Sequence, residues 1–515
     1  MRRTTSLGPA RNTCNWGNTM IYRTISAIAL IAGTATAAPA QEIAQSDNEW
    51  FTAAQERLQQ ELAKQPNTNT AKNIILMISD GNGVGSNYMT RVFMGQQEGG
   101  LGDDFVQHHE TFPNLALVKT YNVNAQTPDS AGTGTAMMAG VKTNIGIIGV
   151  TSAVKRGDCA ALPGNTVTAI SEIADSMGKS VGAISTARIT HATPASMYAK
   201  TADRNYEAAV PEGCDTQDDI ATQLIEAMRA GLIDVAMGGG RRSFIPSDAT
   251  DEEGNSGRRE DGVNLIQVAQ DELGAHYAWN TESFEAAPLD GETPILGLFE
   301  DSHMQYEADR ADEPSLADMT AAAIQALQND EDGFMLMVEA GRVDHANHAT
   351  NAARMVRDGA AFTEAVRIAD ELTDDAETLI VVTADHEHAI ALNGYCGRGS
   401  DILGLCMEVN NEGVEHSGEP IMANDGKPYT VIGYLNGASS VLREDFNWAG
   451  VRPELDEETA TDIDYVQQAL IPLSSETHSA EDVAVYAKGP FAHLYDGTIE
   501  QNVVFHVMHH AMTAE

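Results

Sequence analysis

The sequence predicts an α/β fold, a three-layer sandwich with a central, mostly parallel sheet, helices on both faces and an irregular inserted subdomain. Short apolar runs rich in β-branched residues alternate with helical patterns such as Leu316, Met319, Ile324 and Leu327. This alternation is typical of a parallel sheet covered on both sides. A chain of 515 residues can also bury a large core. The expected strands lie at 74–79, 115–120, 181–185, 334–338, 379–383, 429–434 and 483–486.

Acidic residues follow three of the expected strands. Asp80, Glu339 and Asp385 stand at or just past the ends of three apolar runs, and His386 comes directly after Asp385. Ligands of open α/β sheets bind at the carboxyl ends of the strands. We therefore expect these side chains to form one charged site.

Residues 1–40 have the pattern of a leader that ends in a secretory signal. Arg23 provides a basic start, an apolar stretch follows, and a small-residue cleavage pattern ends at Ala40. Met20 is an alternative start, and a disordered tail with an apolar patch is the competing interpretation. The apolar stretch is too short for a membrane anchor, so we expect a periplasmic or secreted protein.

The remaining residues, 41–515, are expected to form one domain with two insertions. The stretches near 245–262 and 394–470 are irregular and rich in glycine and acidic residues, which is typical of loops added to a sheet scaffold. The sequence shows no internal repeat that would divide this domain further.

Four cysteines lie beyond the leader. An even number of cysteines in an exported protein predicts two disulfides. Proximity in the sequence favours Cys396 with Cys406, which leaves Cys159 for Cys214.

The chain is strongly acidic. It has 75 Asp and Glu residues against 31 Lys and Arg, and its net charge is −44. Loss of the leader, which holds four arginines and no acid, would lower the net charge to −48. Nucleic acids and anionic membranes are therefore poor partners. We expect a solvated acidic surface, as in a halophilic protein from a saline setting.

Asp344 and His348 are spaced to share a metal ion. They stand four residues apart, which places a carboxylate and an imidazole on the same face of a helix. Two residues with this spacing are, in the absence of other signals, more often an ordinary pair on the protein surface than metal ligands. The nearby Glu339, and the buried strand that leads into this segment, favour a ligand set.

The segment from Asp385 to His388 offers further ligands where a strand ends. Asp385 and His386 can converge on one ion if the backbone turns sharply there. Without its position after an apolar run, this pattern would be a weak signal.

Ser130 stands where a helix is expected to begin, in the segment DSAGTGTA. Free N–H groups and the helix dipole favour a developing anion at such a position. The alternative is an ordinary helix cap. A neighbouring metal ion would favour a nucleophile, because coordination lowers the pKa of a hydroxyl group.

His478 and Arg204 carry no signal by themselves. His478 precedes the last apolar run, and Arg204 follows a polar turn. The guanidinium group can nevertheless bind phosphate through two parallel hydrogen bonds.

From residue 73 to the C-terminus the chain resembles the alkaline phosphatases, and its blocks are closer to the animal-type branch than to the enteric bacterial type. Agreement over eight ordered blocks is specific, because the blocks include every expected strand-end ligand. The blocks are ISDGNG, PDSAGTGTAMMAGVKTN, THATPASMYAKTADRN, MGGGRR, LGLFED, FMLMVEAGRVDHANHATN, VVTADHEH and ETHSAEDVAVYAKGPFAHL.

The resemblance implies two zinc sites and one magnesium site. It assigns a first zinc to Asp344, His348 and His478. It assigns a second zinc, which also binds the oxygen of Ser130, to Asp80, Asp385 and His386. The magnesium ligands would be Asp80, Thr193 and Glu339.

Three further roles follow from the same resemblance. His191 stands where some members have an aspartate, and would meet magnesium through a water or favour zinc. His345 would contact phosphate through a water. A calcium site would use Phe299, Glu300 and Glu313, with a further oxygen from residues 251–253.

The implied activity is that of an alkaline phosphatase, a hydrolase with broad specificity for small phosphate monoesters, which it cleaves through a phosphoserine. Arg204 would bind the phosphoryl oxygens, and the enzyme would be a homodimer. A sulfatase is disfavoured because the C-x-P-x-R motif is absent, and Ser130 with Arg204 favours monoesters over diesters. The alternative of another class is an exported protein that binds metal or phosphate without catalysis.

Overall fold

The computed structural model describes residues 43–440 and 450–514. The expected leader lies outside the described residues, as does part of the stretch at 394–470. The chain divides into two compact units, residues 1–65 and 66–515. In the first unit, the described helix is α1 (Glu49–Ala63), which has no buried side chain. The side chain of Asn48 caps it by accepting a hydrogen bond from the Trp50 N–H at 3.0 Å.

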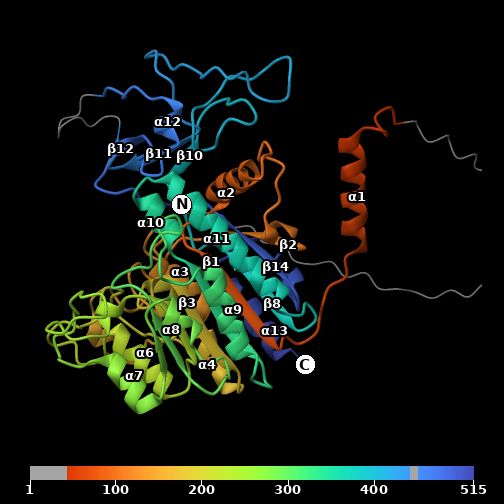
Figure 1. The fold of residues 1–515 in the computed structure, drawn as a ribbon. Coiled ribbons are helices and arrows are strands. Elements are labelled where there is room, and N and C mark those ends of the chain that lie inside the picture. The colour runs from red at the N-terminus through yellow and green to blue at the C-terminus, as the bar shows by residue number, and fades with distance from the viewer. Residues whose placement is uncertain (1–42, 441–449, 515) are drawn as a thin grey trace, which may run out of the picture. The chain divides into compact units, whose positions relative to one another are not determined.

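A ten-stranded sheet forms the centre of the second unit (Figure 1). Its strand order is β15-β2-β14-β8-β1-β7-β3-β4-β6-β5. Among these strands only β14 runs antiparallel to its neighbours, β2 and β8. The expected mostly parallel sheet is confirmed. The strands are β1 (Asn73–Ser79), β2 (Asn114–Lys119), β3 (Ser180–Arg188), β4 (Val235–Gly239), β5 (His276–Ala278), β6 (Ile295–Leu298), β7 (Phe334–Ala340), β8 (Thr378–Thr383), β14 (Val483–Lys488) and β15 (Gly497–Glu500).

The two faces of the sheet pack into separate hydrophobic cores. In β1, Ile74 and Leu76 belong to one core, whereas Ile75 and Met77 belong to the other, as the two-residue period of a strand requires. Helices cover both faces, so the three-layer architecture is confirmed. The first core contains side chains of α3 (Ser130–Ala139), α4 (Ile170–Ser176), α5 (Ala192–Ala195), α6 (Ile220–Arg229), α7 (Leu265–Leu273) and α13 (Val503–Thr513). The second contains side chains of α2 (Val84–Gln97), α8 (Thr281–Glu285), α9 (Leu316–Leu327), α10 (Arg342–His348) and α11 (Ala352–Glu371).

One expected strand belongs to a different sheet. The apolar run at 429–434 overlaps β11 (Ile432–Gly437), which pairs with β10 (Ile390–Leu392) and β12 (Ala469–Pro472) rather than with the central sheet. Leu435 of β11 is exposed, so this strand is not buried along its whole length, unlike β7 and β8 of the central sheet. The same region contains the short helix α12 (Glu457–Ala460).

Two strands of the parallel sheet have weak sequence signals. β4 ends in two glycines, and β6 has only four residues. Both are buried because neighbouring strands and helices cover them. Runs this short cannot be distinguished from buried helix segments by periodicity.

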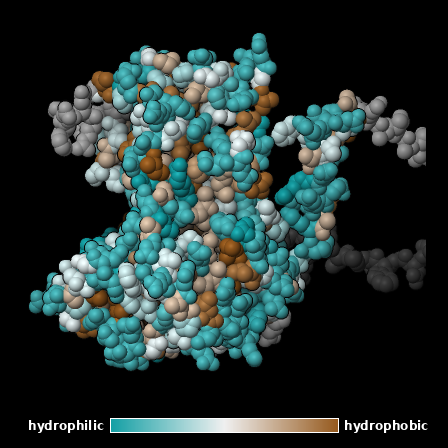
Figure 2. All heavy atoms as spheres, viewed as in Figure 1, coloured by the Kyte–Doolittle hydropathy of each residue, from teal (hydrophilic) through white to brown (hydrophobic). Residues whose placement is uncertain are grey.

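The cysteines pair as the sequence suggested. Cys159 is joined to Cys214, and Cys396 is joined to Cys406. Within the described residues, no helix is long and apolar enough to cross a membrane. The face drawn in Figure 2 is mostly hydrophilic, in keeping with the acidic composition.

The order of the central strands places the acidic residues side by side. β8, β1 and β7 are neighbours, and Ile78 of β1 is level with both Thr383 of β8 and Glu339 of β7. The carboxyl ends of these three strands therefore meet at one edge. Asp80, Glu339 and Asp385 all lie at that edge and are buried.

Candidate metal centre

The first ligand set comes from α10 and β13 (His478–Ser479). Asp344 Oδ1 lies 3.3 Å from His348 Nε2 and 3.2 Å from His478 Nε2. The two Nε2 atoms are 3.1 Å apart. Two ligands that each lie about 2.0 Å from a tetrahedral zinc ion are about 3.3 Å from each other. The spacing of these three atoms therefore fits one zinc ion.

The second set surrounds His386, directly after β8. Its Nε2 atom lies 3.3 Å from Asp80 Oδ1, 3.4 Å from Asp385 Oδ2 and 3.3 Å from Ser130 Oγ. These separations again match those expected around one tetrahedral zinc ion, with the serine hydroxyl as a fourth ligand. The rings of His386 and His478 stack with centroids 3.6 Å apart, so the two sets are adjacent.

Ser130 is the first residue of α3, as the sequence predicted. Asp129 caps this helix by accepting a hydrogen bond from the Gly132 N–H at 3.1 Å. The other carboxylate oxygen of Asp129 accepts from Arg204 Nη1, also at 3.1 Å. One aspartate thus fixes both the start of α3 and the guanidinium group of Arg204.

The third set consists of Asp80, Glu339, His191 and Thr193. One ligand atom from each of the first three lies within 4.8 Å of the others. Both Asp80 oxygens, Glu339 Oε1 and Thr193 Oγ1 are buried and find no hydrogen-bond partner among the described residues. Buried oxygen atoms without partners are costly. A hard cation that binds oxygen ligands would satisfy them.

Two buried carboxyl groups of this site have raised pKa values, which a bound cation would lower again. Burial, reinforced by the facing carboxylates of Asp385, Asp344 and Glu339, raises the pKa of Asp80 well above its usual value. Burial likewise raises the pKa of Glu339 to about 7. A bound metal ion would favour the ionised form of both groups, because an opposite charge nearby lowers a carboxyl pKa.

Three histidines of the site, His386, His345 and His191, have lowered pKa values and are held neutral. Burial, followed by the effect of His478, lowers the pKa of His386 well below its usual value. Burial lowers the pKa of His345 to about 3, and it also lowers the pKa of His191, where Arg204 adds to the effect. A neutral imidazole has a free nitrogen lone pair, which metal binding requires.

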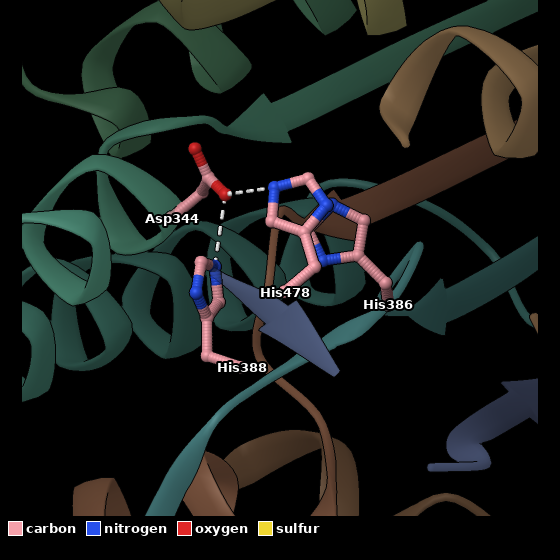
Figure 3. A group of neighbouring side chains, drawn as sticks. All are labelled: Asp344, His386, His388 and His478. Carbon is pink, nitrogen blue, oxygen red and sulfur yellow. Dashed lines mark hydrogen bonds and ion pairs between the residues drawn. The ribbon is translucent and has the colours of Figure 1, made fainter. Parts of the chain in front are cut away.

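Sequence reasoning assigned no role to His388 and Glu476. His388 Nε2 lies 2.8 Å from Asp344 Oδ1, and Nδ1 lies 2.6 Å from Glu476 Oε2. Figure 3 shows His388 and His478 both directed at Asp344. Separations of 2.6 and 2.8 Å are those of hydrogen bonds and are shorter than the ligand–ligand distance around zinc. We interpret His388 as a support for the ligands, although its ring nitrogens lie close enough to them to be counted in the same cluster.

His388 could have been found from its spacing, because it follows His386 by two residues in the short strand β9 (Glu387–His388). Burial would lower the pKa of His388, but the carboxylates of Glu476 and Asp344 outweigh it and raise the pKa to about 10. Glu476 had no such signal. It is one of 75 acidic residues in the chain.

The residues expected to bind calcium lie outside this centre. Gln305 donates hydrogen bonds to both Glu300 and Glu313, and Arg310 donates to Glu313 at 2.9 Å. Arg241 donates to the Phe299 carbonyl oxygen and also pairs with residues 251–253. In the described part of the chain Glu313 and residues 251–253 thus have arginine partners, whereas Glu300 accepts from Gln305. None of these acids belongs to a cluster of three or more candidate ligands.

Comparisons with known proteins agree with this geometry. Residues 71–514 match the family model described as alkaline phosphatase. The tissue-nonspecific alkaline phosphatase of Rattus norvegicus is 40% identical over 481 residues, which cover 90% of this chain and 88% of the rat protein. The alkaline phosphatase of Gadus morhua is 39% identical over 90% of this chain and 96% of its own length. The structure of the Thermus thermophilus alkaline phosphatase has a similar fold, with a TM-score of 0.62 and 22% identity over 88% of this chain and 94% of its own.

Proposed function

This chain belongs to the alkaline phosphatase family, whose members hydrolyse phosphate monoesters, and we propose that it does so through a covalent phosphoserine at Ser130. We propose two zinc ions and one magnesium ion as its cofactors, and broad specificity for small monoesters. The observation that carries the proposal is the position of the Ser130 hydroxyl. It stands at the start of α3, 3.3 Å from the Nε2 atom of His386 and beside a guanidinium group.

The ligand sets support a particular assignment of the metals. Asp344, His348 and His478 would hold the first zinc, and Asp385 with His386 the second. Asp80 would join the second zinc to a magnesium ion held by Thr193 and Glu339. Bound zinc would stabilise charge on the attacking and leaving oxygens and lower the pKa of a water molecule.

The chain's own residues then have defined tasks. Ser130 Oγ gives up its proton and attacks phosphorus, so the Oγ–P bond forms as the bond to the leaving oxygen breaks. The leaving oxygen takes up a proton and departs as the alcohol. Arg204, held by Asp129, binds two phosphoryl oxygens through its planar guanidinium group. A water molecule then attacks phosphorus from the opposite side, which returns a proton to Ser130 and releases inorganic phosphate. Recognition is confined to the phosphoryl group, and this accounts for the broad specificity.

His191 and His345 lie around the phosphate side of the site. His191 Nε2 is 3.1 Å from Arg204 Nη2, and the ring centroid of His345 lies 5.5 Å from that of His191. We propose that His345 contacts phosphate through a water. We also propose that His191 reaches the third metal through a water, because its Nε2 atom already accepts from Arg204.

Three further proposals concern the protein outside the site. Residues 41–515 form the catalytic domain, with insertions near 245–262 and 394–470. The protein is exported to the periplasm or the medium, in keeping with its two disulfides. It acts as a homodimer. A calcium ion at Phe299, Glu300 and Glu313 is a separate proposal, and the ion would have to compete with the ion pair between Glu313 and Arg310.

Trapping the phosphoserine tests the proposed function. The holoenzyme would be incubated at acid pH with an aryl monoester that carries labelled phosphate, then denatured and digested. We expect the label on the peptide that contains Ser130. The matched control is Ser171→Ala, which removes a buried serine of α4 whose hydroxyl bonds the Met197 carbonyl oxygen and should leave labelling intact. Turnover by the parent enzyme without label on Ser130 would overturn the proposal.

A further inference from the structure

Glu476 is a buried carboxylate at the back of the first ligand set. Its side chain has 0% exposure, and it precedes the ligand His478 by two residues. It lies between β12 and β13, in a segment that reaches both α10 and β9. The mechanism described above gives this residue no task.

The side chain of Glu476 makes two short contacts. Oε2 lies 2.6 Å from His388 Nδ1, and Oε1 accepts a hydrogen bond from the Ala389 N–H at 2.7 Å. Because both oxygens are engaged, the carboxylate is fixed in place. His388 in turn contacts Asp344 Oδ1 at 2.8 Å through its other nitrogen. A chain of carboxylate, imidazole and carboxylate therefore ends on a ligand of the first set.

The main chain of Glu476 holds a second ligand. Its carbonyl oxygen accepts a hydrogen bond from His348 Nδ1 at 2.7 Å, and its N–H donates to the His348 carbonyl oxygen at 3.1 Å. A bond to Nδ1 fixes the tautomer of His348 and leaves Nε2 free for a metal ion. His478 is oriented in the same way, through a bond from its Nδ1 to the Pro128 carbonyl oxygen at 2.9 Å.

We propose that Glu476 is a positioning residue of the first zinc site. Its side chain orients Asp344 through His388, and its main chain orients His348. This inference rests on the proposed function, because it takes Asp344, His348 and His478 to be zinc ligands. The residues that support metal ligands commonly change metal affinity by 10- to 100-fold when they are replaced. Glu476 supports two ligands from one position.

Two variants separate the charge of Glu476 from its shape. Glu476→Gln keeps an oxygen for the Ala389 N–H and offers an N–H to His388 Nδ1, so the geometry persists while the negative charge is lost. Glu476→Ala removes both the negative charge and the hydrogen-bonding groups of the side chain. The matched control is Asp219→Asn, which alters another buried carboxylate, the cap of α6 that pairs with Arg259 at 2.9 Å.

The measurement is zinc binding by the folded holoenzyme in competition with a chromophoric chelator. We expect Glu476→Ala to bind one of its two zinc ions about 100-fold more weakly than the parent, and Glu476→Gln about 10-fold more weakly. Asp219→Asn should lower the melting temperature without changing zinc affinity. Should Glu476→Ala fail to fold, Glu476→Gln still decides the question.

The inference is overturned if both Glu476 variants hold zinc as tightly as the parent, or if Asp219→Asn weakens zinc binding equally. A loss of turnover at saturating zinc without a change in affinity would also overturn it. The parent's zinc content and its labelling at Ser130 are measured first. If the parent binds no zinc or carries no label, the proposed function fails. If only the Glu476 variants behave unexpectedly, this inference fails alone.

Discussion

The metal centre and its neighbouring arginine network both contain buried carboxylates, but the groups that balance their negative charge differ. We define the arginine network as Arg310, Arg342, Glu307, Glu313 and Asp358. Arg310 pairs with Glu307 and with Glu313, in each case at 2.9 Å. In the metal centre, by contrast, histidines are the only ion-pair partners of the carboxylates among the described residues. These pairs involve Asp80, Asp344 and Asp385.

The difference indicates which region needs cations from outside the chain. A buried carboxylate is costly unless it is paired, and arginine is charged at every working pH. The neutral imidazoles of His386, His345 and His191 cannot balance the carboxylates, but neutral imidazoles can bind metal ions. The raised pKa of His388 adds one positive charge beside Asp344 and Glu476. The metal centre is therefore built to receive cations, whereas the arginine network already contains its own.

The largest expected effect is that of Ser130→Ala in the metal centre. We predict that turnover of an aryl monoester falls by several orders of magnitude while zinc content hardly changes, because the serine is the nucleophile and only one of several zinc contacts. Residual turnover is expected, since water can attack directly. Turnover equal to that of the parent would remove Ser130 from the mechanism.

Arg204→Ala tests the guanidinium group that we propose binds the phosphoryl oxygens. We predict a loss of transition-state stabilisation of about 2 to 4 kcal/mol in kcat/KM, the range for removing one positioned charged donor. Inorganic phosphate should also inhibit the variant more weakly. The matched control is Arg156→Ala, an exposed arginine that pairs with Asp203. Equal inhibition of parent and Arg204→Ala by phosphate would contradict the assignment.

Calcium binding tests whether Glu313, which belongs to the arginine network, also needs a cation from outside the chain. If a calcium ion binds at Glu300 and Glu313, calcium at 100 times its dissociation constant should stabilise the parent by about 2.7 kcal/mol. Glu313→Gln should abolish this effect, measured as a shift in melting temperature with zinc and magnesium saturating. If elemental analysis finds no calcium in the parent enzyme and added calcium does not change its melting temperature, the calcium proposal is wrong. Arg310 is then the charged partner of Glu313.

Asp358 offers a pH test of the arginine network. Burial raises its pKa to about 7, although Arg342 and Arg310 oppose the shift. Because this folded pKa exceeds the unfolded value of about 4, the stability it contributes is present below pH 4 and is lost as the pH rises through 7. Asp358→Asn cannot ionise. We predict that its melting temperature rises relative to the parent's by a few degrees between pH 5 and pH 8, for which about 1 kcal/mol corresponds to a few degrees. A constant difference would contradict the raised pKa.

The smallest expected effect concerns the excess of acidic over basic residues, which is 75 Asp and Glu against 31 Lys and Arg in the whole chain. Surface repulsion should weaken with salt, because the Debye length falls from about 10 Å at 0.1 M to about 3 Å at 1 M. We predict that the melting temperature rises with sodium chloride from about 0.05 to 2 M, a range that spans this screening, with metals saturating. A level or falling melting temperature would refute adaptation to a saline setting.

The sequence predicted the parts of the site that follow long apolar strands. Asp80, Glu339 and Asp385 were identifiable because each stands at the end of a buried run, and Asp344 with His348 because of their helical spacing. The sheet itself was predictable for the same reason. β4, β5, β6 and β15 were not predicted, because such short strands are defined by their neighbours.

The supports of the metal ligands were beyond sequence reasoning. Glu476 and His388 are 88 residues apart, and only the pairing of β13 with β9 brings their segments together. No periodicity marks a buried carboxylate in a chain rich in acids. Contacts of this kind depend on the tertiary structure rather than on local pattern.

Anomalous scattering at the zinc absorption edge, from crystals of the holoenzyme, tests the central claim most directly. The account predicts two zinc peaks about 4 Å apart, the usual spacing in two-metal sites. One peak should lie among Asp344, His348 and His478. The other should lie among Asp80, Asp385 and His386, within bonding distance of Ser130 Oγ. A single peak, or a peak bound by His388 and Glu476 in place of Asp344 and His478, would contradict the account.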